Sequence, residues 1–367
     1  MRLSDLAQGR DNNFNLIRIV AALIVLVQHA TPTATGMTVE FGRRTLGMSC
    51  ASIAVDVFFV TSGFLVTGSL MRARGIRDYV FSRVARIYPG LIAVVTLTVL
   101  GIGLAFTTLP WSTYMFDAET AEYFARGCTA LFGVSFQLPG VFKTNPYKDS
   151  VNASLWTLPH ELHMYAIVAI VWWLCSRAQV HRRSHAFCTT MICMVAVGAI
   201  LLLSYNFTSL APRENGFRML FFMFFSGAAF FVLRERVILS YPVFWSAIIV
   251  LVLSSLNRSA FFIVYSATLP YILLFVAYVP ASGIRWYNRV GDYSYGVYIY
   301  AFPVEQSFAA LFPGIPTLWM IVSGATTTLV LAAMSWHVIE RPALEIRRRY
   351  FCIAAFGSPV RGGRSCE

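Results

Sequence analysis

The sequence predicts an all-α integral membrane protein, a polytopic bundle of about ten transmembrane helices with one short re-entrant or interfacial helix. Of the 367 residues, 57% are hydrophobic and only 13% are charged, whereas a soluble domain has about 25% charged residues. The apolar residues form repeated runs of about 18 or more, the length that a helix needs to cross a hydrocarbon core of ~30 Å. Such continuous runs do not fit barrel strands, which alternate and cross in about 10 residues.

Ten apolar runs are long enough for spans, and they lie at about 14–34, 51–71, 88–108, 154–176, 186–205, 216–233, 238–255, 260–279, 293–313 and 316–338. One further segment, 121–138, is shorter and carries Glu122 and Arg126, which favours a re-entrant or interfacial helix. No repeat at a fixed period divides the chain. We therefore expect one transmembrane domain over 12–345 and a disordered cytoplasmic tail over 346–367.

The net charge of +12 is explained by where the basic residues lie. With ten spans both termini share one side, and if that side is the cytoplasm it carries 20 of the 29 lysines and arginines. Cytoplasmic loops show this bias, and an eleventh span at 121–138 would reverse it for all later loops. The charge thus indicates an orientation and no nucleic-acid partner. The seven cysteines show no CxxC pair and no metal-ligand spacing, so we expect no metal site.

Among the ionisable residues within the predicted spans, four are candidates for function. The first span carries Arg18 and His29, which a helix would hold roughly 16 Å apart along its axis. Asp56 in the second span and Glu161 in the fourth lie at about the depth of His29, toward the outer face. An arginine in a membrane helix costs roughly 2.5–3.5 kcal/mol, so such residues usually serve a function. The structural alternative is a set of interhelical hydrogen bonds worth ~0.6 kcal/mol each.

A basic stretch follows the second span, on the expected cytoplasmic side. The loop 72–89 holds five arginines, and Arg83 and Arg86 lie one helical turn apart within it. Arginine forks bind phosphate oxygens through two parallel hydrogen bonds, which fits a phosphate-bearing donor. The same arginines could equally signal topology and contact anionic lipid headgroups.

Six segments resemble motifs of the acyltransferase-3 family of integral membrane acyltransferases, and they occur in order between about residues 12 and 345. They are Arg18-x10-His29, Asp56-Val-Phe-Phe-Val-Thr-Ser-Gly-Phe-Leu, Arg83-Val-Ala-Arg86-Ile-Tyr-Pro89, Ser154-Leu-Trp-Thr-Leu-Pro-His-Glu161, Tyr293-Ser-Tyr-Gly-Val-Tyr-Ile-Tyr and Ile339-Glu340-Arg341-Pro342. One such motif alone is weak evidence, but six in sequence are strong.

The resemblance implies a ten-helix enzyme of the bacterial inner membrane, with both termini cytoplasmic. Such enzymes acylate extracytoplasmic glycans such as O-antigen, exopolysaccharide or Nod-factor sugars, with cytoplasmic acetyl-CoA or another acyl-CoA as donor. Polysaccharide-assembly proteins would be possible partners, besides the lipid bilayer and the glycan. In that family the histidine matching His29 is taken as catalytic, Arg18 as essential on the donor side, and the motif of Arg83 and Arg86 as implicated. Some relatives carry a fused esterase-like domain. This chain ends soon after its last span, so we expect it to act alone or with a separate partner.

Together, these residues and the resemblance predict a reaction mechanism. The phosphates of acetyl-CoA would bind Arg83 and Arg86, the pantetheine arm would pass Arg18, and the thioester would reach His29. His29 would act as the general base, oriented by Asp56 or Glu161. Alternatively, His29 would itself be acylated and pass the acyl group on.

Two other functions are compatible with the residues alone. Charged residues in the bilayer also fit an exporter of a glycan or lipid-linked sugar, with His29, Asp56 and Glu161 as a proton relay. An inactive scaffold in a polysaccharide-assembly complex is the third possibility. For a transferase, acceptor choice would lie in the outer loop 109–153, whose aromatic residues could stack on sugar rings or form an interfacial belt. They are Trp111, Tyr114, Phe116, Tyr123, Phe136 and Tyr147.

Overall fold

The structure is a computed structural model, and it describes residues 1–9, 11–37, 42–148, 150–177, 180–208 and 216–347. Within these ranges the chain forms helices joined by turns and loops, with two isolated β-bridges and no longer strand. The predicted all-α bundle is therefore confirmed. The tail expected over 346–367 lies, from residue 348 onward, outside the described residues.

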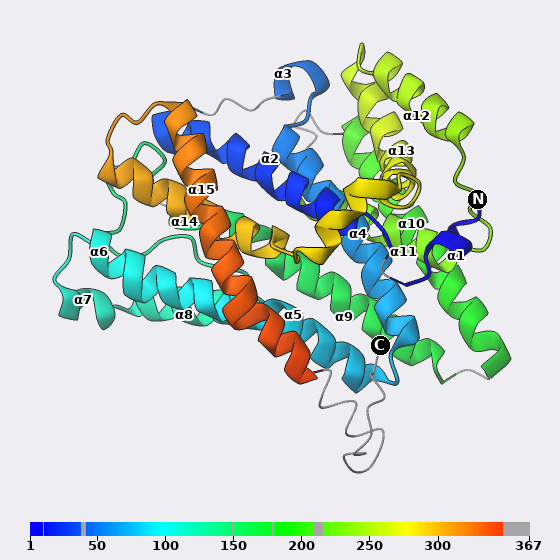
Figure 1. Ribbon diagram of the computed structural model, residues 1–367, viewed down its shortest axis with the longest axis horizontal. Helices are drawn as coiled ribbons and strands as arrows, with labels where there is room; N and C mark the ends of the chain where they lie inside the picture. Colours follow the sequence, from blue (N-terminus) through cyan, green and yellow to red (C-terminus); the bar gives the residue numbers. More distant parts are fainter. Residues whose placement is uncertain (10, 38–41, 149, 178–179, 209–215, 348–367) are drawn as a thin grey trace.

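The helices follow one another along the chain as shown in Figure 1. Their bounds are α1 Leu3–Leu6, α2 Phe14–Thr35, α3 Arg43–Leu46, α4 Cys50–Arg72, α5 Ile76–Thr96, the π-helical turn η1 Leu97–Gly103, α6 Leu104–Phe106, α7 Trp111–Met115, α8 Ala118–Thr129, the 3₁₀ helix η2 Ala153–Thr157, α9 Leu158–Cys175, α10 Val180–Thr208, α11 Gly216–Val232, α12 Tyr241–Ser254, α13 Arg258–Tyr278, the 3₁₀ helix η3 Ser282–Arg289, α14 Ser294–Leu311, α15 Thr317–Ser335 and the π-helical turn η4 Trp336–Glu340.

Seven helices of the described chain are long and apolar enough to cross a membrane. They correspond to seven of the ten expected spans. Two further spans correspond to shorter apolar helices, α11 with 17 residues and α12 with 14. The last corresponds to α14, which has 18 residues and carries Glu305 and Gln306 in its second half. The protein is thus a multi-pass membrane protein.

Two segments differ from their predicted form. The stretch 72–89 is not a loop, because α5 begins at Ile76 and continues through η1 and α6 to Phe106. Its arginines therefore project from a helix. The segment 121–138 is helical only in its first part, since α8 ends at Thr129 and Ala130 adopts the left-handed conformation. The 12 residues of α8 rise about 18 Å, too little to cross the bilayer, in line with the interfacial prediction.

The centre of the bundle is the crossing of α4 with α11, which two glycines allow. A Cβ added to Gly63 would lie 1.8 Å from the carbonyl oxygen of Phe224, and one added to Gly227 would lie 2.1 Å from that of Val60. Small residues let membrane helices approach closely and pack backbone against backbone. The crossing places one face of α4 in the middle of the molecule.

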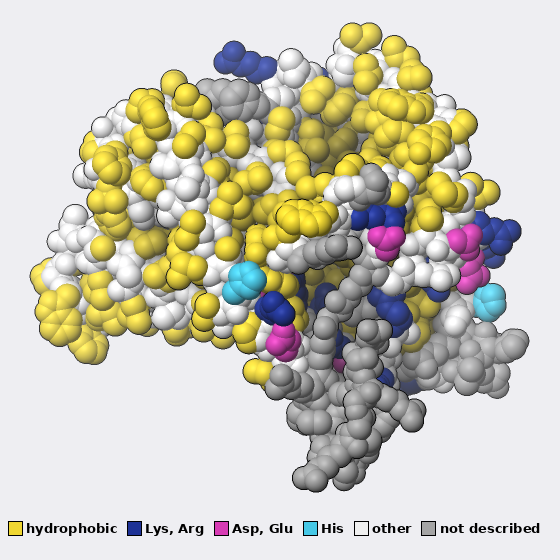
Figure 2. Space-filling model, viewed as in Figure 1, with side chains coloured by type: hydrophobic (Ala, Val, Ile, Leu, Met, Phe, Trp, Pro, Cys, Tyr) yellow, Lys and Arg dark blue, Asp and Glu magenta, His cyan; other side chains and the backbone are white. Residues whose placement is uncertain are grey.

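The other helices pack around this pair. Helix α2 contacts α4, α14 and α15. Helices α12 and α13 pack on each other at the upper right of Figure 1, and α13 also contacts α4 and α11. The surface is largely apolar: Figure 2 shows one face covered by hydrophobic side chains, with most of its visible charges toward the lower right. Exposed residues of α12 and α15, such as Trp245, Leu253, Trp319 and Val330, belong to this apolar surface, as expected for side chains facing lipid.

Candidate active site

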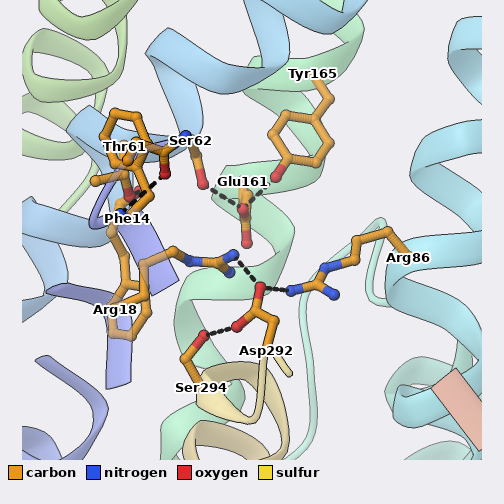
Figure 3. A network of polar contacts seen from close by, with 11 residues as sticks. Phe14, Arg18, Thr61, Ser62, Arg86, Glu161, Tyr165, Asp292 and Ser294 are labelled. Atoms are coloured by element: carbon orange, nitrogen blue, oxygen red, sulfur yellow. Dashed lines mark hydrogen bonds and ion pairs between the residues drawn. The ribbon is translucent and has the colours of Figure 1, made fainter. Parts of the chain in front are cut away.

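Two of the predicted donor-side arginines meet at a carboxylate that sequence reasoning missed. Asp292 lies just before α14, and its Oδ2 accepts a hydrogen bond of 2.7 Å from Arg18 on α2 and another from Arg86 on α5 (Figure 3). The hydroxyl of Ser294 donates to Oδ1. One carboxylate therefore joins three helices that are far apart in the sequence.

The charge of this group is set by its neighbours. Burial opposes the ionisation of Asp292, but the guanidinium groups of Arg18 and Arg86 outweigh it and hold the pKa of that carboxyl well below its usual range. Asp292 thus stays negative, and the pair of arginines retains a net positive charge. Two largely buried arginines that share one carboxylate suit an anionic group such as a phosphate.

Glu161 lies on the first turn of α9, near the group formed by Arg18, Arg86 and Asp292 (Figure 3). Its carboxylate accepts hydrogen bonds from Ser62 on α4, at 2.9 Å, and from Tyr165 one turn further along α9 (Figure 3). Arg83 lies over the ring of Tyr165, 5.8 Å from its centroid, and its own polar contacts are with Ser82 and Ser69. Arg83 and Arg86 therefore face different partners, although they lie one turn apart.

Arg18 and Glu161 line the same small cavity, of about 30 Å³. This is roughly the volume of one water molecule. Val55, Thr157 and Tyr298 are among the residues that complete its wall, and the hydroxyls of Thr157 and Tyr298 are hydrogen-bonded to each other at 2.8 Å.

His29 lines a second and larger cavity, of about 250 Å³. Its ring packs edge-on against Phe302 of α14, with 5.2 Å between the centroids, and its Nδ1 is buried without a hydrogen-bond partner. Tyr147, from the loop 109–153, packs on the same phenylalanine and also lines this cavity. An imidazole in such a cavity can exchange a proton with a bound molecule.

A second missed carboxylate supports the turn that follows His29. Thr33 donates its hydroxyl to the carbonyl of His29 at 2.8 Å, and this hydroxyl lies 3.4 Å from the carboxylate of Glu305 on α14. Glu305 is fully buried. Glu305 could have been identified from the sequence as a candidate, because it is an acidic residue in an apolar span, as Asp56 and Glu161 are.

Asp56 lines a third cavity, of about 300 Å³, and accepts a hydrogen bond of 2.9 Å from Tyr265 on α13. The three predicted catalytic residues, His29, Asp56 and Glu161, thus lie in three cavities rather than in one cluster. The orienting bond expected from a carboxylate to His29 is not formed at Nδ1. The cavities nevertheless adjoin, because Val55 lines all three.

The six aromatic residues of the loop 109–153 lie in different environments. Tyr114 and Tyr123 are buried packing residues, and Tyr114 donates its hydroxyl to the carbonyl of Val99, so neither can stack on a sugar. Trp111 and Phe116 are exposed. Only Tyr147, of the six, is among the residues lining the His29 cavity. Among the described residues, no group of three His, Cys, Asp or Glu side chains could hold a metal ion.

The comparisons with known proteins agree with the motifs. Residues 11–337 match a family model, acyltransferase 3, described as "Acyltransferase domain". The chain is 28% identical over 354 residues to the "O-acetyl transferase" of Shigella phage Sf6, covering 90% of this chain and 96% of that protein. It is 25% identical over 370 residues to "Nodulation protein 10" of Rhizobium leguminosarum bv. viciae, covering 93% and 95%. No solved structure matches the chain. The protein therefore belongs to the acyltransferase-3 family and is a multi-pass membrane enzyme that transfers acyl groups other than aminoacyl groups.

Proposed function

We propose that this enzyme moves an acetyl or other short acyl group from cytoplasmic acyl-CoA to a hydroxyl of an extracytoplasmic glycan. The observation that carries the proposal is the order of the groups along α2. Arg18, paired with Asp292 and near Arg86, lies toward one end, and His29, in its own cavity, lies toward the other. The name of the phage relative supports acetyl as the group and oxygen as the acceptor atom.

The donor would bind first through its phosphates. A guanidinium group has five N–H donors, so Arg86 can keep its bond to Asp292 and still donate to a phosphate. Arg83, on the same face of α5, would add a second cation. The acyl end would then pass Arg18, whose Nε is buried without a hydrogen-bond partner, and enter the cavity of Arg18 and Glu161.

The passage to His29 requires a movement. Val55 and Tyr298 line both the small cavity and the His29 cavity, so they form the wall between them. The hydroxyl of Tyr298 is hydrogen-bonded to that of Thr157, and in this proposal the bond keeps the wall closed. We propose that donor binding breaks this bond and lets the thioester reach the imidazole.

The chemical step would then be a direct transfer. The acceptor oxygen attacks the thioester carbonyl carbon while His29 takes the hydroxyl proton, which typically contributes 10²–10⁴-fold to the rate. The C–S bond breaks, and the imidazolium returns the proton to the thiolate sulfur. An O-acyl ester and free coenzyme thiol result. In the alternative, the imidazole nitrogen takes the acyl group first and the acceptor oxygen attacks this acyl-imidazole.

The test uses purified protein with acetyl-CoA labelled in the acetyl group and a glycan acceptor. The acceptor is the surface polysaccharide of the host strain, de-O-acetylated with alkali and cut into oligosaccharides. His29→Ala should lower the transfer rate about 10²–10⁴-fold and leave the Kd for acetyl-CoA unchanged. His163→Ala, an exposed histidine on α9, is the matched control.

Near wild-type transfer by His29→Ala would contradict the catalytic role. Labelled protein that accumulates without acceptor would select the acyl-histidine route over direct transfer. If deletion in cells keeps the polysaccharide from reaching the surface, instead of removing its acetyl groups, an exporter is the correct function.

A further inference from the structure

The third cavity adjoins the His29 cavity and has no role in the mechanism above. Its volume of about 300 Å³ is that of a small ligand pocket and about twice that of a protein cavity known to bind benzene. Its lining comes from the start of α4, from η2 and from the start of α11: Met48, Ser52, Val55, Asp56, Trp156, Gly216, Met219 and Leu220. Ser52, Val55 and Trp156 also line the His29 cavity.

The shared wall lies on one face of α4. Ser52 and Asp56 are four residues apart and Val55 lies between them, so all three side chains point the same way. A molecule in the third cavity would therefore touch Asp56 and reach, past Ser52 and Val55, into the cavity of His29. This face of α4 therefore connects the third cavity directly to the His29 cavity.

The chemistry of the lining combines a flat aromatic surface with a carboxylate. The indole of Trp156 is 38% exposed and is held edge-on against His160, with 5.9 Å between the ring centroids. Asp56 accepts a hydrogen bond from Tyr265 at Oδ2, which is not its only interaction, and a carboxylate offers about four acceptor sites. A sugar ring has an apolar C–H face that can stack on an aromatic ring and hydroxyls at its edge that can donate to a carboxylate. A hydrocarbon tail would gain nothing from Asp56.

We propose that this third cavity binds a sugar ring of the acceptor glycan, with Trp156 stacking on its face and Asp56 accepting bonds from its hydroxyls. The proposal rests on the proposed O-acyltransferase function. It gives Asp56 the role of holding the acceptor, in place of orienting His29. One hydroxyl of the bound ring, or of its neighbour along the glycan, then lies beyond Val55 and faces the imidazole.

The first experiment measures the KM for the oligosaccharide acceptor defined above and the Kd for acetyl-CoA. Trp156→Ala should raise the acceptor KM about ten-fold, and Asp56→Asn about ten- to a hundred-fold, with the Kd for acetyl-CoA unchanged in both. Trp156→Phe keeps an aromatic face and should restore most of the affinity. Trp245→Ala is the matched control, because this tryptophan is exposed on α12.

A second experiment leaves Trp156 and Asp56 in place. Gly216 is exposed and lines the cavity, so Gly216→Cys, in a chain whose native cysteines are replaced by serine, gives a thiol that a maleimide can label. The acceptor oligosaccharide should slow this labelling several-fold, and acetyl-CoA alone should not.

The outcomes separate the two proposals. If the wild type transfers acetyl groups but Trp156→Ala and Asp56→Asn keep its acceptor KM, the third cavity does not bind the sugar. Labelling of Gly216→Cys that the acceptor leaves unchanged in an active protein leads to the same conclusion. If the wild type binds acetyl-CoA and transfers nothing to the glycan, the glycan acceptor itself is wrong, and this inference is wrong with it.

Discussion

Asp292 shows how one short polar residue can organise a site built from distant segments. It links α2 and α5 through Arg18 and Arg86, and it is itself tied to the first residue of α14 through Ser294. A lysine or arginine pair without such a partner would be repelled by its own charge within the bundle. The carboxylate therefore positions both guanidinium groups, which we propose bind a donor phosphate.

We predict that Asp292→Asn lowers the free energy of unfolding by about 3 kcal/mol or more, because removing one partner leaves buried charges unpaired. Thermal unfolding in detergent measures this effect, and the Kd for acetyl-CoA should rise as well. Glu345→Gln is the control, since its pair with Arg341 is about half exposed and such surface pairs are worth about 1 kcal/mol or less. Equal stability of the two variants would show that Asp292 does not hold the arginines.

The depth of each site residue along its helix can be predicted from the sequence, but the direction in which its side chain points cannot. Depth follows from counting, because each residue adds 1.5 Å along a helix, and it orders Arg18 and His29 along α2. The rotation of each helix about its axis depends on packing, which the sequence does not reveal. Asp56 therefore faces Tyr265, and Glu161 faces Ser62, where a shared cluster with His29 was expected. Asp292 escaped notice because it lies outside the predicted spans.

At the scale of elements, the crossing of α4 and α11 sets the position of the cavity-lining face of α4. We predict that Gly63→Ala lowers the free energy of unfolding by about 1–3 kcal/mol, the usual cost of overpacking, since its Cβ would overlap the carbonyl oxygen of Phe224. Thermal unfolding in detergent measures it. Gly101→Ala is the control, because the nearest atom to its Cβ is a flexible leucine side chain at 3.2 Å. A tolerated Gly63→Ala would mean that the two helices can separate freely.

Helix α14 also holds the loop 109–153 against the His29 cavity. The amide of Gln306 donates to the carbonyls of Tyr147 and Ser150, at 2.8 and 2.6 Å, and receives a bond from Asn145 at 2.9 Å. These contacts keep the ring of Tyr147 in the cavity wall. In the sequence, Gln306 is only a polar residue in a predicted span. Its partners could not be predicted, because they lie more than 150 positions away.

We predict that Gln306→Leu loosens this loop, because the carbonyls of Tyr147 and Ser150 lose their partner, at a cost of about 1–3 kcal/mol each when buried. The amide of Asn145 keeps only its bond to the main-chain carbonyl of residue 306. Hydrogen exchange should become faster at residues 141–148 and stay unchanged in α12. Ser323→Ala on α15, whose hydroxyl bonds only within its own helix, should leave exchange at 141–148 as in the wild type. Unaltered protection of the loop in Gln306→Leu would assign its order to other contacts.

At the scale of the whole molecule, the sequence predicted the all-α bundle and most of its spans, because length and hydropathy alone determine whether a helix can cross a bilayer. The prediction of a loop over 72–89 is wrong from Ile76 onward, because charged residues hide the continuity of α5. Orientation is a further prediction from the bias of the arginines.

We predict that a cysteine at Lys143 is labelled by a membrane-impermeant maleimide in intact cells, and that a cysteine at Arg77 is labelled only after lysis. Both positions are exposed, so access depends on the side of the membrane. The native cysteines are replaced by serine in both chains. The reverse pattern would place the donor site outside and overturn the proposed direction of transfer.

The narrowness of the cavity between Arg18 and Glu161 matters for the energy supply of the cell. An enzyme that joins two compartments through one bundle risks becoming a pore that dissipates the proton gradient. Here the space leading toward the imidazole holds about one water molecule, and Val55 and Tyr298 separate it from the larger chamber. In the transfer proposed above, this wall would interrupt a chain of waters, so that an acyl group could pass while the membrane stayed sealed to ions.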